Sequence, residues 1–416
     1  RLPRVYFGNA FSRTNVDSDY VYNIGQYGPS AGPIPNLSTG SVTGITDPRF
    51  FWTRSSQSDY VYGQNGYRLY AFTHFTDPNF EGPSTYKSNI ALNLQFANGY
   101  DVRFEYNKDS VNKALMWKDL SYSEEGTLAD GRALLDQREN PYLTNTGEGG
   151  GEAFSIIATK AFDNGVNLYA GYTNMEMEDA SRVASAQADS AYNKQPHDLA
   201  GENLRAAPSD FMVDDKLIIG LDYTTQIFGT NDTRFSVLAN RKSGRRYSLV
   251  YETGDSEVSI TDGNWEAYDL IYVPTGVNDP NVVFASDAVA SSVMNFLSSG
   301  CAAGFSGQIM TRNACKGDYA TRVDLRITQD FQVNDDQKIV IYFDIQNLIN
   351  FLDDDKGWQT EIDTNSVSRA VSVDLDQTTD SGQLYITGVN EDAGLIYSTD
   401  YGQSQWQMNL GISYKF

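Results

Sequence analysis

The strongest constraint in this sequence is a two-residue alternation of apolar and polar side chains that recurs along the chain. It is clearest in the last segment, whose polar partners include Gln407 and Asn409. The apolar members of this segment are Trp406, Met408, Leu410, Ile412, Tyr414 and Phe416. Successive side chains of a β-strand point to opposite faces, so the pattern predicts a strand with one apolar face.

Short turn sequences separate pairs of these alternating segments. Examples are Asn98-Gly99, Asp163-Asn164-Gly165 and Asn334-Asp335-Asp336. A turn of this kind between two alternating runs is typical of a β-hairpin. We therefore expect antiparallel hairpins made from about ten strands. The expected strands cover residues 4–13, 87–97, 100–110, 152–162, 166–175, 216–228, 232–250, 320–331, 338–348 and 405–416.

The connections alternate between short turns and very long loops. The long loops cover residues 14–86, 119–151, 176–215, 252–320 and 349–404. Soluble sandwiches have mostly short loops at both ends, whereas outer-membrane barrels have short turns on one side, long loops on the other and aromatic girdles. The sequence thus predicts an all-β fold, a transmembrane antiparallel β-barrel with long extracellular loops. A soluble all-β protein is the alternative.

Charged residues occupy the strand positions opposite the apolar ones. They are Arg103, Glu105, Asp222, Arg234, Arg322, Asp324, Arg326 and Asp344. Charges are costly in lipid, so we expect this face to line a wet lumen or contact a plug.

The chain is strongly acidic, with 54 Asp and Glu against 31 Lys and Arg and a formal net charge of −23. This balance argues against a nucleic-acid partner, because phosphate contacts require clustered basic residues. Acid-rich loops favour cations, metal chelates or basic peptides as ligands. The uncharged stretch 288–311 is too polar for a membrane helix, and we expect a short amphipathic helix there, capped by Ser286 and stopped at Gly300.

The two cysteines, Cys301 and Cys315, lie 14 positions apart in a segment rich in small residues. Their spacing fits a disulfide in an oxidising compartment, and two free thiols are the alternative. Two cysteines without nearby histidines do not suit structural zinc, which takes four ligands.

Other candidate sites are weak. The only histidines are His74 and His197, which we interpret as ordinary structural residues. Asp353, Asp354 and Asp355 lack the spacing of a calcium loop, so a solvated acidic rim is the favoured interpretation over a divalent-cation site. No catalytic elbow or phosphate-binding loop is present in the sequence, and we expect no enzyme activity, no cofactor and no metal centre.

Several sequence blocks resemble Oar-type TonB-dependent outer-membrane receptors. These are Arg1–Ala10, Thr321–Gln329 and Phe343–Asn350, and the ending Gly411–Phe416 is similar to the assembly signal of outer-membrane barrels. The resemblance implies a 22-stranded barrel, plugged by an N-terminal domain and driven by the TonB complex. The sequence shows no plug and only about ten strands. Residues 1–416 are therefore expected to be the C-terminal portion of the barrel domain of a longer chain.

Three functions fit these observations. The first is a TonB-dependent transporter in the outer membrane of a Gram-negative bacterium, with the loops capturing an unknown ligand. The second is an Oar-like barrel used for protein export, surface display or adhesion. The third is a soluble all-β binding module. The first two imply as partners the outer-membrane lipid and lipopolysaccharide, the barrel assembly machinery and, for the transporter, the TonB complex through an N-terminal part.

Overall fold

The computed structural model describes residues 75–77, 79–119, 124–135, 141–181, 192, 194–197, 205–253, 268–362, 367–390, 397–399 and 404–416 of the 416-residue chain. The strand expected at residues 4–13, the block Arg1–Ala10 and His74 lie outside these residues. Most of the described chain forms β-strands, which confirms the predicted all-β class. None of the helices in the described residues has the length and apolarity needed to cross a membrane.

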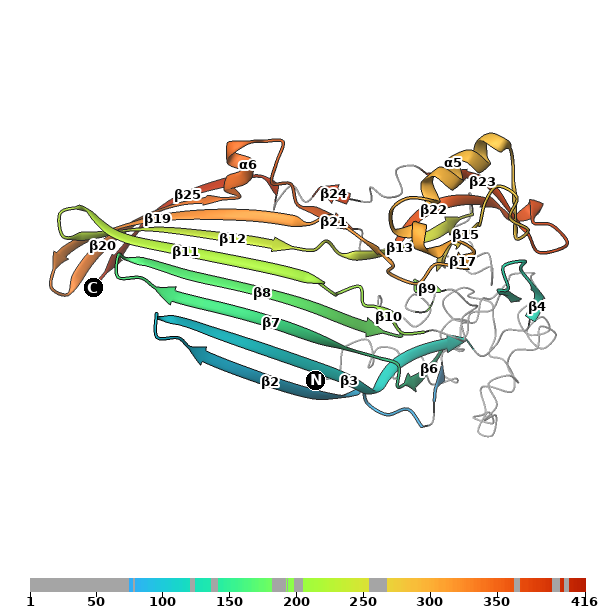
Figure 1. Cartoon of the computed structure of the whole chain (residues 1–416), viewed down its shortest axis with the longest axis horizontal. Coiled ribbons are helices and arrows are strands. Elements are labelled where there is room, and N and C mark those ends of the chain that lie inside the picture. The colour runs from blue at the N-terminus through green and yellow to red at the C-terminus, as the bar shows by residue number, and fades with distance from the viewer. Residues whose placement is uncertain are drawn as a thin grey trace, which may run out of the picture.

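Long antiparallel strands form one curved sheet, which we term the wall (Figure 1). Each strand pairs with its neighbours in the sequence, as the hairpin turns predict. The strands are β2 (Ser84–Gln95), β3 (Tyr100–Asp119), β7 (Gly149–Ala161), β8 (Val166–Asp179), β11 (Asp215–Phe228), β12 (Asn231–Lys242), β19 (Ala320–Asn334), β20 (Gln337–Gln346) and β25 (Gln407–Lys415).

The short turns all lie at one end of the wall, termed the turn end, and the long connections leave from the opposite loop end (Figure 1). Gly165 shows why the turn between β7 and β8 needs glycine. Its φ is +85°, a region that L side chains rarely adopt, and an added Cβ would meet the carbonyl oxygen of Thr224. The hairpin between β7 and β8 is therefore fixed by local chain geometry.

A second, mixed sheet of strand order β16-β23-β22-β13-β18 lies beyond the loop end. We term this sheet, with the helix α5 and the 3-10 helix η3, the loop module. Its elements are β13 (Arg246–Glu252), β16 (Val282–Phe284), α5 (Asp287–Leu297), η3 (Gly300–Phe305), β18 (Cys315–Lys316), β22 (Val367–Asp374) and β23 (Leu384–Val389). The module has its own hydrophobic core, in which Val293, Leu297 and Val371 are fully buried.

The strand predicted at residues 232–250 is wrong in its extent. The wall strand β12 ends at Lys242, and the separate strand β13 joins the loop module. The backbone around Gly244 passes so close to Gly317 that a Cβ would clash with it. The centre of β13 is buried on consecutive residues, as expected for a strand covered on both faces.

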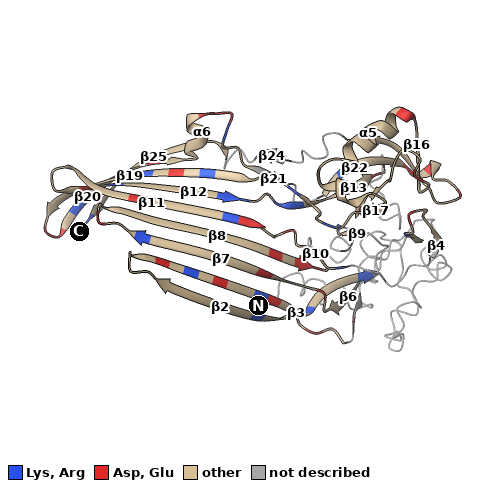
Figure 2. Cartoon of the chain, viewed as in Figure 1, with Lys and Arg blue, Asp and Glu red and all other residues tan. Residues whose placement is uncertain are grey.

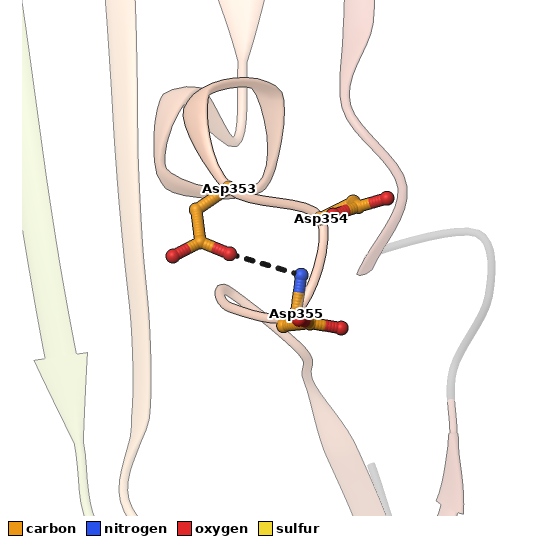
Figure 3. Close-up of side chains that lie close together, drawn as sticks. All are labelled: Asp353, Asp354 and Asp355. Carbon is orange, nitrogen blue, oxygen red and sulfur yellow. Dashed lines mark hydrogen bonds between the residues drawn. The ribbon is translucent and has the colours of Figure 1, made fainter.

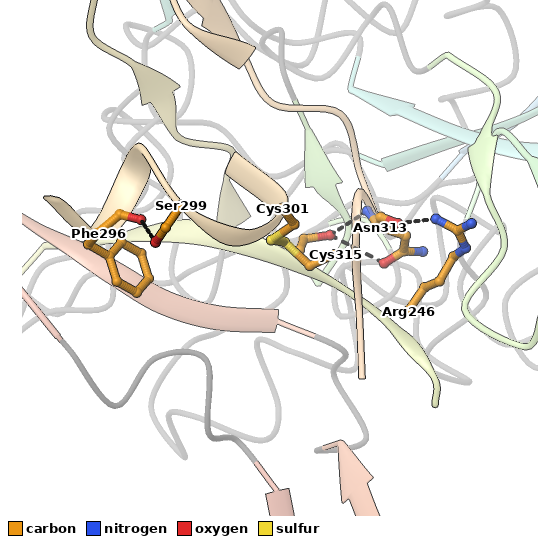
Figure 4. Close-up of a disulfide and its surroundings, with 7 residues drawn as sticks. Arg246, Phe296, Ser299, Cys301, Asn313 and Cys315 are labelled. Atoms are coloured by element: carbon orange, nitrogen blue, oxygen red, sulfur yellow. Dashed lines mark hydrogen bonds between the residues drawn. A yellow bond between two sulfur atoms is a disulfide. The ribbon is translucent and has the colours of Figure 1, made fainter. Parts of the chain in front are cut away.

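The predicted helix and disulfide are present in the loop module. The Ser286 side chain accepts a hydrogen bond from the Val289 N–H (3.2 Å), which caps the start of α5. The helix ends before Gly300, which has a φ of +61°. Cys301 and Cys315 form a disulfide with a Cα–Cα distance of 5.1 Å, which joins η3 to β18 (Figure 4).

Small elements complete the described fold. Helix α6 follows directly after β20, where the sequence predicts two more strand residues. The remaining elements are β1 (Phe75–Thr76), β4 (Glu124–Thr127), β5 (Ala133–Leu135), β6 (Pro141–Thr146), β9 (Pro196–His197), β10 (Ala207–Pro208), β14 (Tyr268–Asp269), β15 (Tyr272–Val273), β17 (Gln308–Ile309), α6 (Leu348–Leu352), β21 (Thr360–Ile362), η4 (Leu375–Gln377) and β24 (Tyr397–Thr399).

Candidate functional site

One face of the wall is apolar along its whole width. The strand registers align apolar residues of neighbouring strands in continuous rows. One row consists of Leu168, Leu221, Val237, Leu325, Ile345 and Met408, on six successive strands. Much of this face is open: Leu221 is 42% exposed and Leu410 is 74% exposed. An apolar surface this wide does not face water in a stable protein.

Aromatic residues border this apolar face at both ends of the strands. At the turn end, Tyr100 and Phe162 meet edge to face, with ring centroids 6.5 Å apart. The Lys160 ammonium lies 4.2 Å from the centroid of the Tyr100 ring. Its long side chain places the charge at the border of the apolar band rather than within it. Phe154, near the middle of β7, lies eight residues from Phe162 in the direction of the loop end, which is roughly 27 Å of extended chain. Because the strands of membrane barrels tilt by about 35–45°, this stretch spans roughly 20 Å of an apolar band that is about 25 Å high.

The opposite face of the wall is polar. A row of polar residues crosses six strands in register: Asn167, Asp222, Ser236, Arg326, Asp344 and Asn409. Arg326 donates two hydrogen bonds to Asp344, at 2.5 and 2.7 Å. The Ser236 hydroxyl donates to the Asp222 carboxylate. Figure 2 shows charged residues at intervals along the strands of the wall.

All eight charged residues that the alternation selects lie on this polar face. Arg103 pairs with Glu105 (2.9 Å), and Arg322 pairs with Asp324 (2.8 Å). Arg234 lies within 3.5 Å of the Thr224 hydroxyl. A shallow hollow of about 350 Å³ opens on this face, and its charged lining is Asp222, Arg322, Asp324, Arg326 and Asp344. The polar face thus carries both signs of charge around this hollow.

These two faces define the class of the fold. Strands that carry a membrane-high apolar band on one side and ion pairs on the other form the wall of an outer-membrane type β-barrel. The antiparallel hairpins, short turns and aromatic borders all belong to this class. The predicted fold class is therefore confirmed at the level of an antiparallel barrel wall.

Both lateral edges of the wall lack a partner among the described residues. There, β2 pairs only with β3, and β25 pairs only with β20. An open sheet edge cannot remain unpaired in lipid, because its backbone groups would have no hydrogen-bonding partner. In a closed barrel, both edges would be paired.

The predicted assembly signal forms one of these edges. Strand β25 pairs with β20 over its full length, from Gln407 to Lys415. Its apolar residues remain open, and Phe416, the last residue, is 93% exposed. Tyr414 lies next to Phe416, with ring centroids 5.9 Å apart.

A buried polar network joins the loop module to the loop end of the wall, and the sequence alone did not indicate it. Asn313 is fully buried and adopts a φ of +57°. Its side-chain amide donates to the Asp210 carboxylate at 2.5 Å, and its backbone N–H donates to the Ser248 hydroxyl at 2.9 Å. Arg246 donates to the Asn313 carbonyl oxygen (3.3 Å), as Figure 4 shows. This network fixes the chain just before Cys315.

A buried arginine is the second feature without a sequence signal. Arg132 is fully buried and pairs with Asp130, and it donates to the Leu270 carbonyl oxygen at 2.8 Å. Its guanidinium also lies 5.5 Å from the centre of the Tyr251 ring. Burial raises the pKa of Tyr251 to about 12. The segment containing β4 and β5 is thus attached to the loop module by a charge within its core.

The aspartate cluster at residues 353–355 and His197 show no arrangement that strengthens them as candidate functional sites. One carboxylate oxygen from each of Asp353, Asp354 and Asp355 lies within 4.8 Å of the others. Asp353 already accepts a hydrogen bond from the Asp355 N–H (3.2 Å, Figure 3) and pairs with Lys356 at 2.6 Å. His197 is buried in β9, with its Nδ1 atom 3.8 Å from the Asp269 carboxylate. These contacts are those of a local turn and a packed strand.

No protein-family model matches the chain, and no curated protein matches it. Among solved structures, it is similar to BauA, the ferric preacinetobactin receptor from Acinetobacter baumannii, with 12% identity, a TM-score of 0.35, and coverage of 80% of this chain and 29% of that one. It is also similar to the outer membrane transporter YddB from Escherichia coli, with 12% identity, a TM-score of 0.42, and coverage of 83% and 34%. The chain thus spans about a third of the length of these proteins. The NanC porin matches with 8% identity and a TM-score of 0.16, covering 63% of this chain and 81% of the porin. Likeness this distant assigns neither family nor function.

Proposed function

We propose that this chain forms part of the barrel of an outer-membrane transporter of the TonB-dependent receptor kind, in which the loop module helps to capture a ligand. The observation that carries the proposal is the polar row of the wall, which crosses six strands directly behind the apolar band. Ion pairs such as Arg326–Asp344 are retained there because the face meets water. A wet inner face is what a transport path requires.

The loop module supports a receptor rather than a simple pore. Long loops of a pore can remain structurally independent, whereas here three connections share one hydrophobic core, and a disulfide braces one of them. A folded module holds its surface residues in fixed positions, which favours selective binding. With a net charge of −23 on the chain, we expect a cationic ligand, a metal chelate or a basic peptide.

The open edges support a larger barrel. We propose that strands outside the described residues pair with β2 and β25, and that residues 1–416 are the C-terminal portion of the barrel domain. The TonB complex would act through an N-terminal part, and the barrel assembly machinery would recognise β25.

Cysteine accessibility tests the assignment of the two faces. Ser236 and Val237 are neighbours on β12 but point to opposite faces. In full-length protein in the outer membrane, we expect Ser236→Cys to react rapidly with a small charged methanethiosulfonate and Val237→Cys to react at least tenfold more slowly. The native cysteines form a disulfide and do not interfere. Equal reaction rates would contradict a wet inner face and a lipid-facing outer face.

Uptake measurements test the transport function. Cells with and without the gene should be compared for accumulation of labelled metal chelates and labelled basic peptides, each with and without an active TonB complex. We expect binding at the surface to need the protein alone and uptake to need TonB as well. Loss of a surface or secreted protein in the deletion strain, with unchanged uptake, would instead favour the export or display alternative.

A further inference from the structure

A cluster of basic residues lies at the loop end of the wall, around the junction of β12 and β13. Figure 2 shows this basic stretch at the end of β12. Arg241 and Arg245 are both exposed. Within the described residues, neither of them forms an ion pair with an acidic side chain. Two uncompensated arginines at one place are unusual for a chain with a net charge of −23.

Arg241 belongs to the apolar face of the wall. In the strand register it lies opposite Leu217, one step above the pair formed by Ala239 and Ile219. The Arg241 guanidinium lies 4.5 Å from the centre of the Tyr319 ring. Tyr319 is 43% exposed, so the pair is accessible from outside the wall. The arginine therefore lies where the apolar band ends and the aromatic border begins.

Lys316 and Arg245 continue the cluster. The Lys316 ammonium lies 5.3 Å from the same Tyr319 ring, and the Gly317 N–H donates to the Arg245 carbonyl oxygen at 2.8 Å. The Arg245 guanidinium lies 6.0 Å from the ring of Phe211, which is 71% exposed. Each arginine thus has an aromatic ring beside it and an open side toward the surroundings.

The two acids at the start of β11, Asp214 and Asp215, are paired with other basic groups. Asp214 pairs with Arg246 at 2.8 Å and with Lys316 at 3.0 Å. Asp215 pairs with Lys316 at 3.6 Å and also accepts hydrogen bonds from the hydroxyls of Tyr172 (2.6 Å) and Tyr319 (3.0 Å). Arg241 and Arg245 therefore carry the excess positive charge of this region.

We propose that Arg241 and Arg245, with Tyr319 and Phe211, bind the phosphate groups of a lipid headgroup in the membrane leaflet at the loop end. This proposal rests on the placement of the wall in the outer membrane. Guanidinium groups bind phosphate through two parallel hydrogen bonds, and arginines at the membrane border select phosphorylated lipids. The continuity of the cluster with the apolar face identifies a lipid, because acyl chains would lie along the band below.

Native mass spectrometry of the full-length protein in detergent micelles tests this site. The probe is lipid A with two phosphates, and the variant is Arg241→Gln with Arg245→Gln. We expect the unmodified protein to retain lipid A and the double variant to bind it at least tenfold more weakly. The matched control is Lys216→Gln with Lys242→Gln, since these exposed lysines pair in register on the polar face of the same two strands. The control should bind within twofold of the unmodified protein.

Two further arms define the ligand. Dephosphorylated lipid A should not be retained, and inorganic pyrophosphate at equal phosphate concentration should not displace lipid A. Displacement by pyrophosphate would assign a site for a soluble phosphate and would overturn the lipid. Equal lipid A binding by the double variant, or an equal loss in the control, would overturn the site. Heat-modifiable migration on a gel verifies that each variant is folded, and a folded, uptake-competent protein without bound lipid A would refute this inference while leaving the transport proposal intact.

Discussion

Asp179, the last residue of β8, and Arg312, in the loop before β18, form an ion pair at 2.5 Å although 133 residues separate them. Arg312 is buried, with 4% of its surface exposed, and it also donates to the Ala207 carbonyl oxygen at 3.5 Å. The pair connects the loop end of the wall to the segment that enters the loop module. It therefore sets where the module lies relative to the barrel.

We expect Arg312→Gln to loosen this connection. Breaking a buried ion pair costs about 3 kcal/mol or more, and the 34% exposure of the Asp179 side chain reduces the expected cost to about 2 kcal/mol. Hydrogen exchange of residues 246–252 should become faster. Lys87→Gln, which removes an exposed pair with Asp109, is the control and should leave this exchange unchanged. Unchanged exchange in Arg312→Gln would show that the pair does not hold the module.

The disulfide should stabilise the loop module. The two cysteines are 14 residues apart in the sequence. A disulfide that closes a loop of this size reduces the chain entropy of the unfolded state and thereby stabilises the folded state by about 3 kcal/mol. Cys301→Ser with Cys315→Ser should lower the first thermal transition and expose α5 to protease. The unmodified protein should show no alkylated thiol without reductant. Two alkylated cysteines in that protein would contradict the bond.

Tyr251 should make the loop module sensitive to alkaline pH. Burial raises its pKa to about 12, from an ordinary value of 10.0, so the unfolded state loses its proton first as pH rises. The Tyr251 contribution to stability is fully present below pH 10 and decreases by roughly 2–3 kcal/mol between pH 10 and pH 12.

A pair of melting curves checks this effect. Thermal unfolding of the module should be measured at pH 9 and pH 11.5 in the unmodified protein and in Tyr251→Phe. The variant loses the hydrogen bond that the Tyr272 N–H donates (3.1 Å), so it should be less stable at pH 9. Its further decrease toward pH 11.5 should be smaller than that of the unmodified protein. An equal decrease would assign the alkaline sensitivity to other groups.

The last strand should be required for assembly. Phe416 is almost fully exposed, and one edge of β25 has no partner within the described part of the chain. We expect deletion of residues 407–416 to abolish heat-modifiable barrel in the outer membrane, and Phe416→Ala to reduce it several-fold. Lys415→Gln on the same strand should assemble normally. Normal assembly of the truncated chain would exclude this strand as the signal.

The sequence by itself determined the wall. Alternation and turn chemistry are local properties. The hairpin of β2 and β3, in which Tyr100 begins the second strand, and the last strand β25, which contains Tyr414, could therefore be located from neighbouring residues alone. The same holds for α5. Its cap, Ser286, accepts a hydrogen bond from the N–H of Val289, which is only three residues away. The two charges of the Arg326–Asp344 pair were placed on the polar face by the same two-residue period.

Only the tertiary structure decided how the loops are organised. The end of β12 at Lys242 depends on the close approach of Gly317 to Gly244. The burial of Arg132 and the contact of Arg312 with Asp179 depend on segments more than a hundred residues apart. No periodic pattern encodes such pairings, because they arise when separate connections share one hydrophobic core. The arginine cluster at Arg241 likewise becomes visible only when strand register brings Tyr319 beside it.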